Sequence, residues 1–331
     1  MWYPILAEAL YTPSPHNVQP WRVRVVSEDR AELFIEAGRT LPCGDTTGSF
    51  LLLTMAMFVE AVRISAALHG QRLCVSLCPY PNLTNPITGA DTLLPFAHLT
   101  LVPGEPKTDV DLGLLWTRRT SRRADYRPEL PVPGAVAALQ AIAQNAGQTF
   151  TLLTDPAQIE PILESNTKAL LADLNTPDYH GELVRWFRFS DRQAKASRDG
   201  LSFRCMNTPQ ALFWWAARFP QTLRPALLRP FVQRVYRRQM GTVPALGIVS
   251  GPFWKPEEAV SAGAFLLRFW LELARQDLFI HPFGNLVTNR NAAAFVRRAT
   301  GIENVWFVFR VGYCPQPLQS LRRNLEEVLV P

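Results

Sequence analysis

The stretch "TTGSFLLLTMAMFVEAVRISAALHG", residues 46–70, holds a long run of apolar residues at helical spacing. Apolar residues occupy almost every side of this helix, which is typical of a helix buried in the centre of a protein. Gly70 is a residue type that commonly ends helices. A second helix of the same kind, "EEAVSAGAFLLRFWLELARQ", is predicted at residues 257–276. Because both helices carry small residues, the pair favours a chain with an internal duplication.

Strand patterns surround both helices. We predict strands at residues 21–27, 31–37, 72–80, 96–104, 148–155, 245–251 and 305–313, and helices at 4–12, 133–147, 156–174 and over most of 180–240. Alternating helices and strands predict an α+β or α/β protein. The stretch "VPGEPKTDVD", residues 102–111, is rich in proline, glycine and charge. We therefore divide the chain into a first half, residues 1–111, and a second half, residues 112–331.

The composition is that of a globular protein with a large core: 47% of the 331 residues are hydrophobic and 19% are charged. Only four of the 34 basic residues are lysines. Arginine suits the recognition of phosphates and carboxylates, but a genome rich in arginine codons would give the same bias. The composition leaves both explanations open.

Targeting and metal-binding signals are missing from the sequence. The first residues contain Glu8 and no basic segment, so no signal peptide is predicted. The longest uninterrupted apolar run is about ten residues, and a membrane span needs about 20. The five cysteines form no C-x-x-C pair, so no zinc site is predicted, and Cys74 and Cys78 are expected to be buried thiols. We expect a soluble, cytoplasmic protein.

The most basic stretch is "WTRRTSRRADYRPELP", residues 116–131. Its clustered arginines alternate with hydroxyl side chains, a combination that suits a phosphate. A solvated basic turn would look the same. Nucleic-acid binding is disfavoured because no helix-turn-helix or zinc finger accompanies the cluster. Neither a dinucleotide-binding G-x-G-x-x-G, nor a P-loop, nor a G-x-S-x-G elbow is present.

The stretch "TPSPHNVQPW", residues 12–21, holds an Asn and a Gln between prolines, just before a predicted strand. Rigid placement of two amides at that point is what the edge of a cofactor would require. Two further segments are candidates for ligand binding. In "HPFGNL", residues 281–286, a turn could aim main-chain N–H groups into a cleft. The other is "QSLRRNLEEVL", residues 319–329, which contains a pair of arginines. His281 is read as a core histidine in preference to a general acid.

Together these segments resemble the nitroreductase-like FMN flavoproteins. Residues 12–21 are similar to the family's P-S-x-x-N-x-Q-P-W segment, "RRTSRR" at 118–123 to its R-R-S-x-R segment, "HPFGNL" to its Pro-x-x-Gly turn, and residues 319–329 to its C-terminal arginine segment. The Asn/Gln segment precedes the arginine segment here, the reverse of the usual order. That order resembles the Acg-type branch, in which two fused halves in one chain imitate the family homodimer.

The resemblance implies an α+β nitroreductase-like fold, with antiparallel sheets packed on central helices, and one FMN at the seam between the halves. The implied FMN-binding residues are Pro13, Ser14, Pro15, Asn17, Gln19, Arg118, Arg119, Thr120, Arg122, Gly284, Asn285, Ser320, Arg322 and Arg323. The arginines would hold the phosphate, Asn17 would bond the flavin edge, and the amides of Gly284 and Asn285 would face flavin N5. No catalytic side chain and no metal are implied.

The implied function is an FMN-dependent oxidoreductase that passes hydride through flavin N5 to a small acceptor, with NAD(P)H as a candidate donor. The alternative is an FMN-storage protein with little turnover. A monomeric pseudo-dimer or a homodimer would both suit a duplicated chain. Residues 200–240 are the expected lid over the flavin. Aromatic residues and arginines alternate in residues 211–238, which would also suit a membrane surface, but we favour the lid.

Overall fold

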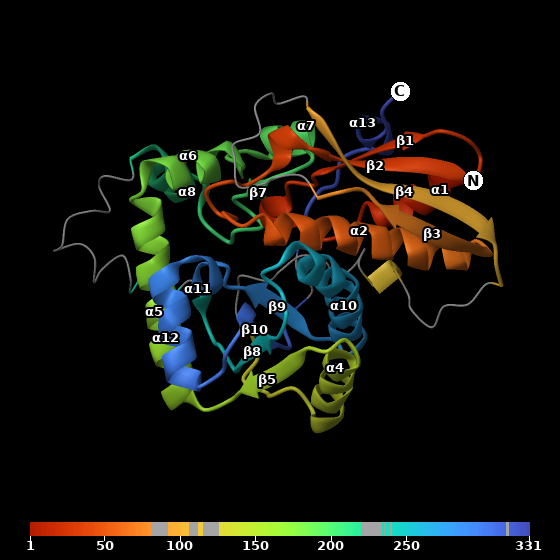
Figure 1. The fold of residues 1–331 in the computed structure, drawn as a ribbon. Coiled ribbons are helices and arrows are strands. Elements are labelled where there is room, and N and C mark those ends of the chain that lie inside the picture. The colour runs from red at the N-terminus through yellow and green to blue at the C-terminus, as the bar shows by residue number, and fades with distance from the viewer. Residues whose placement is uncertain are drawn as a thin grey trace.

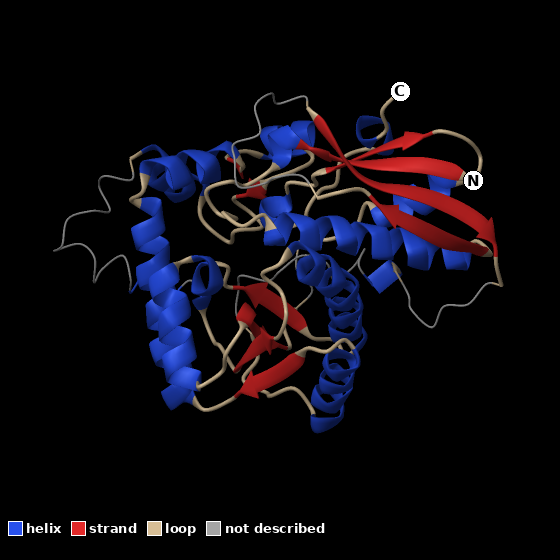
Figure 2. Ribbon diagram, viewed as in Figure 1, coloured by secondary structure: helices blue, strands red, loops and turns tan. Residues whose placement is uncertain are grey.

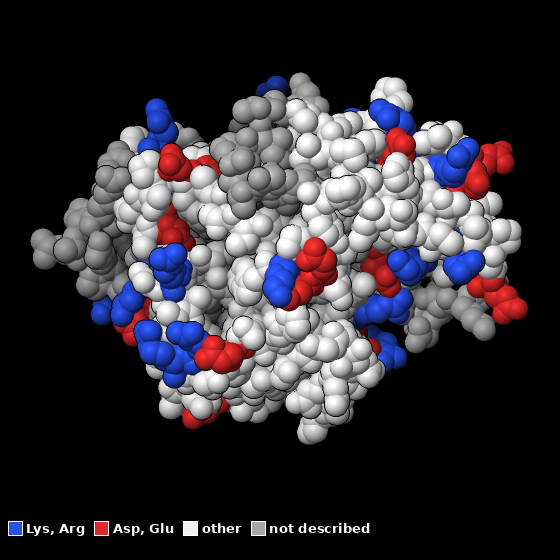
Figure 3. All heavy atoms as spheres, in the orientation of Figure 1, with Lys and Arg blue, Asp and Glu red and all other residues white. Residues whose placement is uncertain are grey.

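The protein's structure is a computed structural model. It describes residues 1–80, 92–105, 112–114, 126–219, 234, 236–238, 240–315 and 318–331. The arginine segment at 118–122 lies outside these residues, as does part of the expected lid. On the face shown in Figure 3, basic and acidic side chains lie mostly beside one another, around a broad uncharged area.

The first half forms a four-stranded antiparallel sheet in the order β1-β2-β4-β3. Its elements are α1 (Trp2–Ala9), the short helices η1 (Pro15–Asn17) and η2 (Ala37–Arg39), β1 (Trp21–Val25), β2 (Arg30–Glu36), α2 (Ser49–Leu68), β3 (Gln71–Leu77) and β4 (Leu93–Pro103). The helices α1 and α2 pack on one face of this sheet (Figure 1). On β1 the side chains alternate between buried and more exposed positions, as expected for a sheet covered on one face.

The second half forms another four-stranded antiparallel sheet, in the order β5-β8-β10-β9. Its strands are β5 (Thr149–Leu153), β8 (Ala245–Ser250), β9 (Phe279–Pro282) and β10 (Val305–Gly312). Helices α4 (Pro133–Asn145) and α10 (Pro256–Arg275) cover one face, and α5 (Pro156–Leu174) and α12 (Arg290–Thr300) cover the other (Figures 1 and 2). Every residue of β8 is buried, because this sheet has helices on both sides.

The two sheets share one connectivity. In each, two strands precede a long apolar helix and two strands follow it, and the corresponding strands occupy the same places in the sheet. This arrangement confirms the predicted antiparallel sheets on central helices and the α+β class. It is also what a duplication would produce, although the duplication itself stays a prediction.

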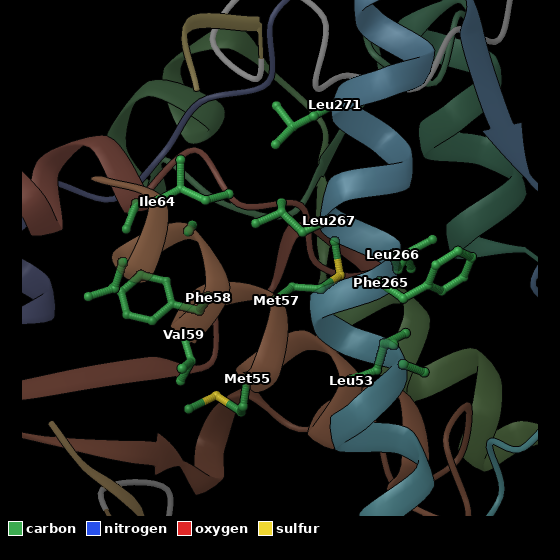
Figure 4. Close-up of a cluster of buried hydrophobic side chains, with 14 of the residues drawn as sticks. Leu53, Met55, Met57, Phe58, Val59, Ile64, Phe265, Leu266, Leu267 and Leu271 are labelled. Atoms are coloured by element: carbon green, nitrogen blue, oxygen red, sulfur yellow. The ribbon is translucent and has the colours of Figure 1, made fainter. Parts of the chain in front are cut away.

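The central helices α2 and α10 pack directly against each other (Figure 4). At their crossing, a Cβ on Gly263 would lie 2.4 Å from the Cβ of Ala56 and 2.7 Å from the carbonyl oxygen of Leu53. Only glycine allows so close an approach, because any side chain would overlap the facing helix. On the opposite side of α2, Phe58 stacks on Trp21 of the first sheet, with ring centroids 4.7 Å apart. These contacts join the two halves into one core.

The second half carries additional segments between β5 and β8 and after β9. They include α6 (Pro177–Arg185), β6 (Phe187–Arg188), α7 (Asp191–Ser197), β7 (Leu201–Ser202), α8 (Gln210–Arg218), α11 (Asn285–Thr288) and, near the C-terminus, α13 (Leu325–Val328). The strands β6 and β7 pair in parallel. The prediction that residues 180–240 are mostly helical is correct for α6, α7 and α8 but missed these two strands.

Two further predictions need correction, and one is confirmed. The strand β9 and the helix α12 were not predicted, because β9 is only four residues long and α12 is rich in arginine. Cys74 is exposed, not buried, because it lies on the uncovered face of β3. α2 is long and apolar enough to cross a membrane by composition, yet 83% of its most apolar window is buried inside the protein. It is therefore a core helix.

Candidate functional site

The opening segment, residues 12–20, adopts a backbone conformation that is rare for its residue types. His16, Asn17 and Gln19 have φ angles of 48°, 55° and 51°, in the left-handed region that non-glycine residues seldom occupy. The N–H of Gln19 donates to the hydroxyl of Ser14 (3.0 Å). Left-handed residues in a row cost free energy, and such strain persists only where surrounding contacts enforce it.

The side chain of Asn17 contacts two distant segments. Its amide nitrogen donates to the carbonyl oxygens of Gly200 (3.4 Å) and Leu321 (3.1 Å). Its amide oxygen accepts a hydrogen bond from Arg322 (2.7 Å). Arg322 also donates to the hydroxyl of Ser320 (2.8 Å). The amide of Asn17 is therefore engaged by protein groups, and its expected hydrogen bond to a flavin edge stays a prediction.

Gln19 contacts the same two segments. Its amide nitrogen donates to the carbonyl of Arg198 (3.0 Å), and its amide oxygen accepts from the N–H of Arg323 (2.9 Å). Arg198 in turn donates to the carbonyl of Arg322 (2.7 Å). We call residues 186–203 the strap and residues 318–331 the tail. The opening segment, the strap and the tail thus meet at one place.

Ion pairs hold the strap against the first half. Asp199, whose carboxylate is only 4% exposed, accepts from Arg39 (2.7 Å) and pairs with Arg188. Burial alone would raise the pKa of Asp199, but the hydrogen bonds and charges of these two arginines outweigh it and lower the pKa. Both guanidinium groups also lie within 6 Å of the Trp186 ring, at 5.7 and 5.9 Å from its centroid. The strap is thus anchored by two ion pairs of Asp199 close to Trp186.

A second arginine–carboxylate cluster holds the tail. Glu36, at the end of β2, pairs with Arg323 (2.9 Å), Arg39 (3.3 Å) and Arg22 (3.5 Å). Burial and the positive charge of Arg39 lower the pKa of Arg323, although Glu36 partly offsets this. One carboxylate thus faces three arginines, and the surroundings of the tail are strongly positive.

The start of α11 lies in a separate cluster. Asn285 donates to a carboxylate oxygen of Asp173 (2.6 Å) and lies 3.4 Å from the hydroxyl of Tyr179. Burial and the charge of Asp173 raise the pKa of Tyr179 to about 12. The main-chain N–H groups of Gly284 and Asn285 have no hydrogen-bond acceptor among the described residues. Two adjacent donors are therefore free at this point.

Glu182 of α6 connects this cluster to the first half. Its carboxylate accepts from the N–H groups of Cys43 (2.7 Å) and Gly44 (2.9 Å). Burial raises the pKa of Glu182, and these hydrogen bonds only partly counter it. Burial and the neighbouring Glu182 also raise the pKa of the Cys43 thiol. Cys43 is therefore not an activated nucleophile.

The predicted site residues fall into three groups. Those of the opening segment and the tail come together: Pro13, Ser14, Pro15, Asn17, Gln19, Ser320, Arg322 and Arg323. Gly284 and Asn285 lie in the separate cluster at the start of α11. The loop of residues 39–45 and α6 connect this cluster to the strap. Arg118, Arg119, Thr120 and Arg122 lie outside the described residues, so the phosphate-binding role expected of them stays a prediction.

Sequence reasoning missed the residues that hold the site together, above all Asp199, Arg39 and Glu182. Only the Asp-Gly turn at residues 199–200 signalled a special backbone there. His281 is buried in β9, with its ring centroid 5.0 Å from that of Phe283, as expected of a core histidine. Among the described residues no cluster of His, Cys, Asp and Glu could hold a metal ion.

The sequence relatives are named as putative nitroreductases. No protein-family model matches the chain. It is 27% identical over 186 residues to "Putative NAD(P)H nitroreductase Rv3131" of Mycobacterium tuberculosis H37Rv, and equally to its counterpart MT3217 in strain CDC 1551. The alignment covers 55% of this chain and 49% of each relative. The chain thus spans about half the length of the curated relatives it matches.

Solved nitroreductases match part of the chain at low similarity. The FMN-dependent nitroreductase NfnB of Mycobacterium smegmatis, solved with NADPH, matches with 16% identity and a TM-score of 0.38, over 65% of this chain and 94% of that one. A nitroreductase of Bacteroides fragilis, solved with bound FMN, matches with 14% identity and a TM-score of 0.36, over 66% and 95%. At these TM-scores the likeness is partial.

Proposed function

We propose that this protein is an FMN-dependent oxidoreductase related to the nitroreductases, with NAD(P)H as the electron donor. The observation that carries the proposal is the hydrogen bond from Arg322 to Asn17, which joins residues 305 positions apart. It brings together the two described segments, 12–21 and 319–329, that resemble the family's FMN-binding segments. The relatives named as NAD(P)H nitroreductases support the same class.

The residues present suit FMN in two respects. The tail supplies arginines in a positive environment, which favours a phosphate or the oxygen-rich edge of a flavin. The free N–H groups of Gly284 and Asn285 suit an acceptor atom on a flat ring. The amides of Asn17 and Gln19, in contrast, are used within the protein. We assign them the task of fixing the opening segment as a rigid wall.

Bound FMN would supply the redox chemistry, as a hydride carrier between NAD(P)H and a small acceptor. The protein would contribute position and electrostatics. Prolines 13 and 15 hold the wall, Arg322 contributes positive charge, and the N–H groups at the start of α11 would stabilise negative charge on the ring. Tyr179 stays neutral, because its pKa is raised to about 12, and it supports Asn285 without exchanging a proton.

We further propose one FMN per chain, bound between two halves that arose by duplication, as in the Acg-type branch. Only the first half has an N-x-Q-P-W segment. Residues 200–240 remain the proposed lid, and their described part begins at β7, next to Gly200, which bonds Asn17. The acceptor that receives the hydride is left open.

The decisive experiment is the absorbance spectrum of the purified protein, followed by identification of the released cofactor. We expect non-covalent FMN near one per chain, and bleaching of its colour by NADPH without oxygen. A colourless protein that does not take up added FMN would refute the proposal. A yellow protein that NADPH does not bleach would support FMN storage without turnover.

The arginines permit a sharper test. A charged hydrogen bond contributes about 1.5–3 kcal/mol, so Arg118→Ala or Arg322→Ala should each weaken FMN binding by roughly ten- to a hundredfold. If both hold one phosphate, the double variant should differ from the sum of the singles by more than about 0.5 kcal/mol. Riboflavin, which lacks the phosphate, should not distinguish the variants. Arg297→Ala, on the exposed face of α12, is the control and should bind FMN normally.

A further inference from the structure

The helix α8 is apolar on both its inner and its outer face. Its inner face is made of Phe213 and Ala217, which are 5% and 6% exposed. The Phe213 ring packs on Phe187 of the strap, with centroids 4.4 Å apart. On the outer face, Leu212 and Trp214 are 38% and 49% exposed. A surface helix normally turns polar residues outward, so the exposed apolar face requires a partner.

The exposed apolar surface continues beyond α8. Phe219, which follows the helix and is 36% exposed, packs edge-on against Trp214 with ring centroids 5.9 Å apart. Between α7 and α8 lies an open groove of about 630 Å³, lined mainly by Phe189, Gln193, Gln210, Ala211, Trp214 and Trp215. Contiguous apolar surface of this kind marks an interaction site on a soluble protein.

Basic side chains lie on both helices that flank the groove, Arg192 and Lys195 on α7 and Arg218 on α8. The whole stretch of residues 189–219 contains five basic and two acidic residues. Both acids are already paired, Asp191 with Arg204 (2.6 Å) and Asp199 with Arg39 (2.7 Å). Among the described residues, the exposed side chains of Arg192, Lys195 and Arg218 have no carboxylate partner.

We propose that the outer face of α8 docks on the surface of an anionic lipid bilayer. Trp214 and Leu212 would enter the interface between headgroups and acyl chains, where tryptophan is favoured. Arg192, Lys195 and Arg218 would contact the lipid phosphates. This docking is compatible with the proposed lid, because the inward contacts of α8 use Phe213 and Ala217 and leave Leu212 and Trp214 partly exposed.

A second copy of this chain is a poorer occupant of the same face. A symmetric dimer would place the same patch on both subunits. Two patches that each carry Arg192, Lys195 and Arg218 would then face each other, and like charges repel. An anionic bilayer satisfies the apolar face and the unpaired cations together.

The test is co-sedimentation of the full chain with vesicles. We expect binding to vesicles of equal parts phosphatidylglycerol and phosphatidylcholine, little binding to pure phosphatidylcholine, and weaker binding as salt rises. Arg192→Gln and Lys195→Gln should each weaken binding by about fivefold. The double variant Leu212→Gln/Trp214→Gln should weaken it at least tenfold. A cooperative melting transition of this variant would show that the loss of binding does not come from unfolding.

Trp254→Gln is the matched control, because Trp254 is 38% exposed but packs on Phe50 and Phe253, away from α8. It should bind anionic vesicles like the wild type. Three results would overturn the proposal: no binding to anionic vesicles at low salt, unchanged binding by the Leu212/Trp214 variant, or a solution dimer that the same variant dissociates. The outcome is independent of whether the protein holds FMN.

Discussion

The two sheets have the same strand order but different surroundings. The first sheet is covered by helices on one face, and the side chains of β1 alternate between buried and more exposed positions. The second sheet is covered on both faces, and all of β8 is buried. The cover on the outer face of the second sheet comes from α5 and α12, which have no counterpart among the described residues of the first half.

The difference shows where the candidate site comes from. The chain that follows α5 does not return directly to the second sheet but forms α6 and the strap, which reach the opening segment of the first half. After β10, the tail crosses to the same place. The candidate site therefore lies where the strap and the tail of the second half meet the opening segment of the first half. The two sheets support these segments.

The largest effect is expected at the crossing that joins the two halves. Gly263→Leu would place a side chain where a Cβ alone would lie 2.4 Å from Ala56. We expect a loss of about 4–5 kcal/mol in the free energy of unfolding, measured by urea titration, because helix backbones would have to separate. Because both sheets depend on the α2–α10 contact, the substitution should destabilise both halves together.

Gly134→Leu is the control for that substitution. Gly134 lies in the first turn of α4, and a Cβ there meets nothing within 4 Å. Its free energy of unfolding should change by less than about 0.5 kcal/mol. Equal losses at both positions would show that the close approach of α2 and α10 is not needed.

The next effect concerns the strap. Asp199→Ala would leave Arg39 and Arg188 without their shared carboxylate, and we expect a loss of about 2–3 kcal/mol. Limited proteolysis should then cut within residues 186–203 while the sheets stay intact. Asp191→Ala removes an ion pair with similar geometry, but its partners Asp191 and Arg204 are 45% and 57% exposed. Exposed ion pairs contribute little to stability, so this substitution should cost clearly less than Asp199→Ala, and comparable costs would contradict the anchoring role of Asp199.

Much of the framework could be predicted from the sequence. The central helices and most strands lie close to their predicted positions, because apolar periodicity reports burial directly. The strand β9 could not be predicted, since four residues after a long helix carry too little pattern. The exposure of the Cys74 side chain could not be predicted either, because it depends on which face of the first sheet the helices cover.

The site was predictable only in part. The prolines and amides of residues 12–20 are unusual locally, and that signal was sufficient to select them. The partners of Asn17 and Gln19 are carbonyl groups of the strap and the tail. Because every residue has a main-chain carbonyl group, the side-chain sequence does not indicate which carbonyl groups will accept these hydrogen bonds. The roles of Asp199 and Glu182 depend on long-range pairing, which a single sequence does not reveal.

The starts of the two central helices differ in the surroundings of their carboxylates. Asp45 accepts a hydrogen bond from the N–H of Leu51 (2.8 Å) at the start of α2, and burial raises its pKa from 3.8 to about 6. At the start of α10, the carboxylate of Glu258 instead accepts from the N–H of Lys255 in an exposed turn. The start of α2 should therefore titrate in the mildly acidic range.

The sign of the effect follows from the raised pKa. Between pH 3.8 and about 6, the folded protein keeps a proton that the unfolded chain releases. The stabilisation is complete below this range and is lost as the pH rises through it. Asp45→Asn cannot titrate, so its stability relative to the wild type should improve by on the order of 2 kcal/mol between about pH 4 and 7. Urea titrations at several pH values would show this, and a constant difference would contradict it.

The smallest effect is expected at the edge of the first sheet. β1 is an edge strand, and the tail covers it: the N–H of Val330 donates to the carbonyl of Val23 (2.9 Å). Removing residues 329–331 should therefore cost about 1 kcal/mol, the value of one or two exchanged hydrogen bonds. The second sheet should be unaffected, so hydrogen exchange should accelerate in β1 and not in β8. Arg24→Ala, which removes exposed contacts to Pro331 and Glu32 and leaves the main chain of the tail in place, should cost less than about 0.5 kcal/mol. Faster exchange in both sheets would show that the tail stabilises the whole molecule and does not simply cover one edge.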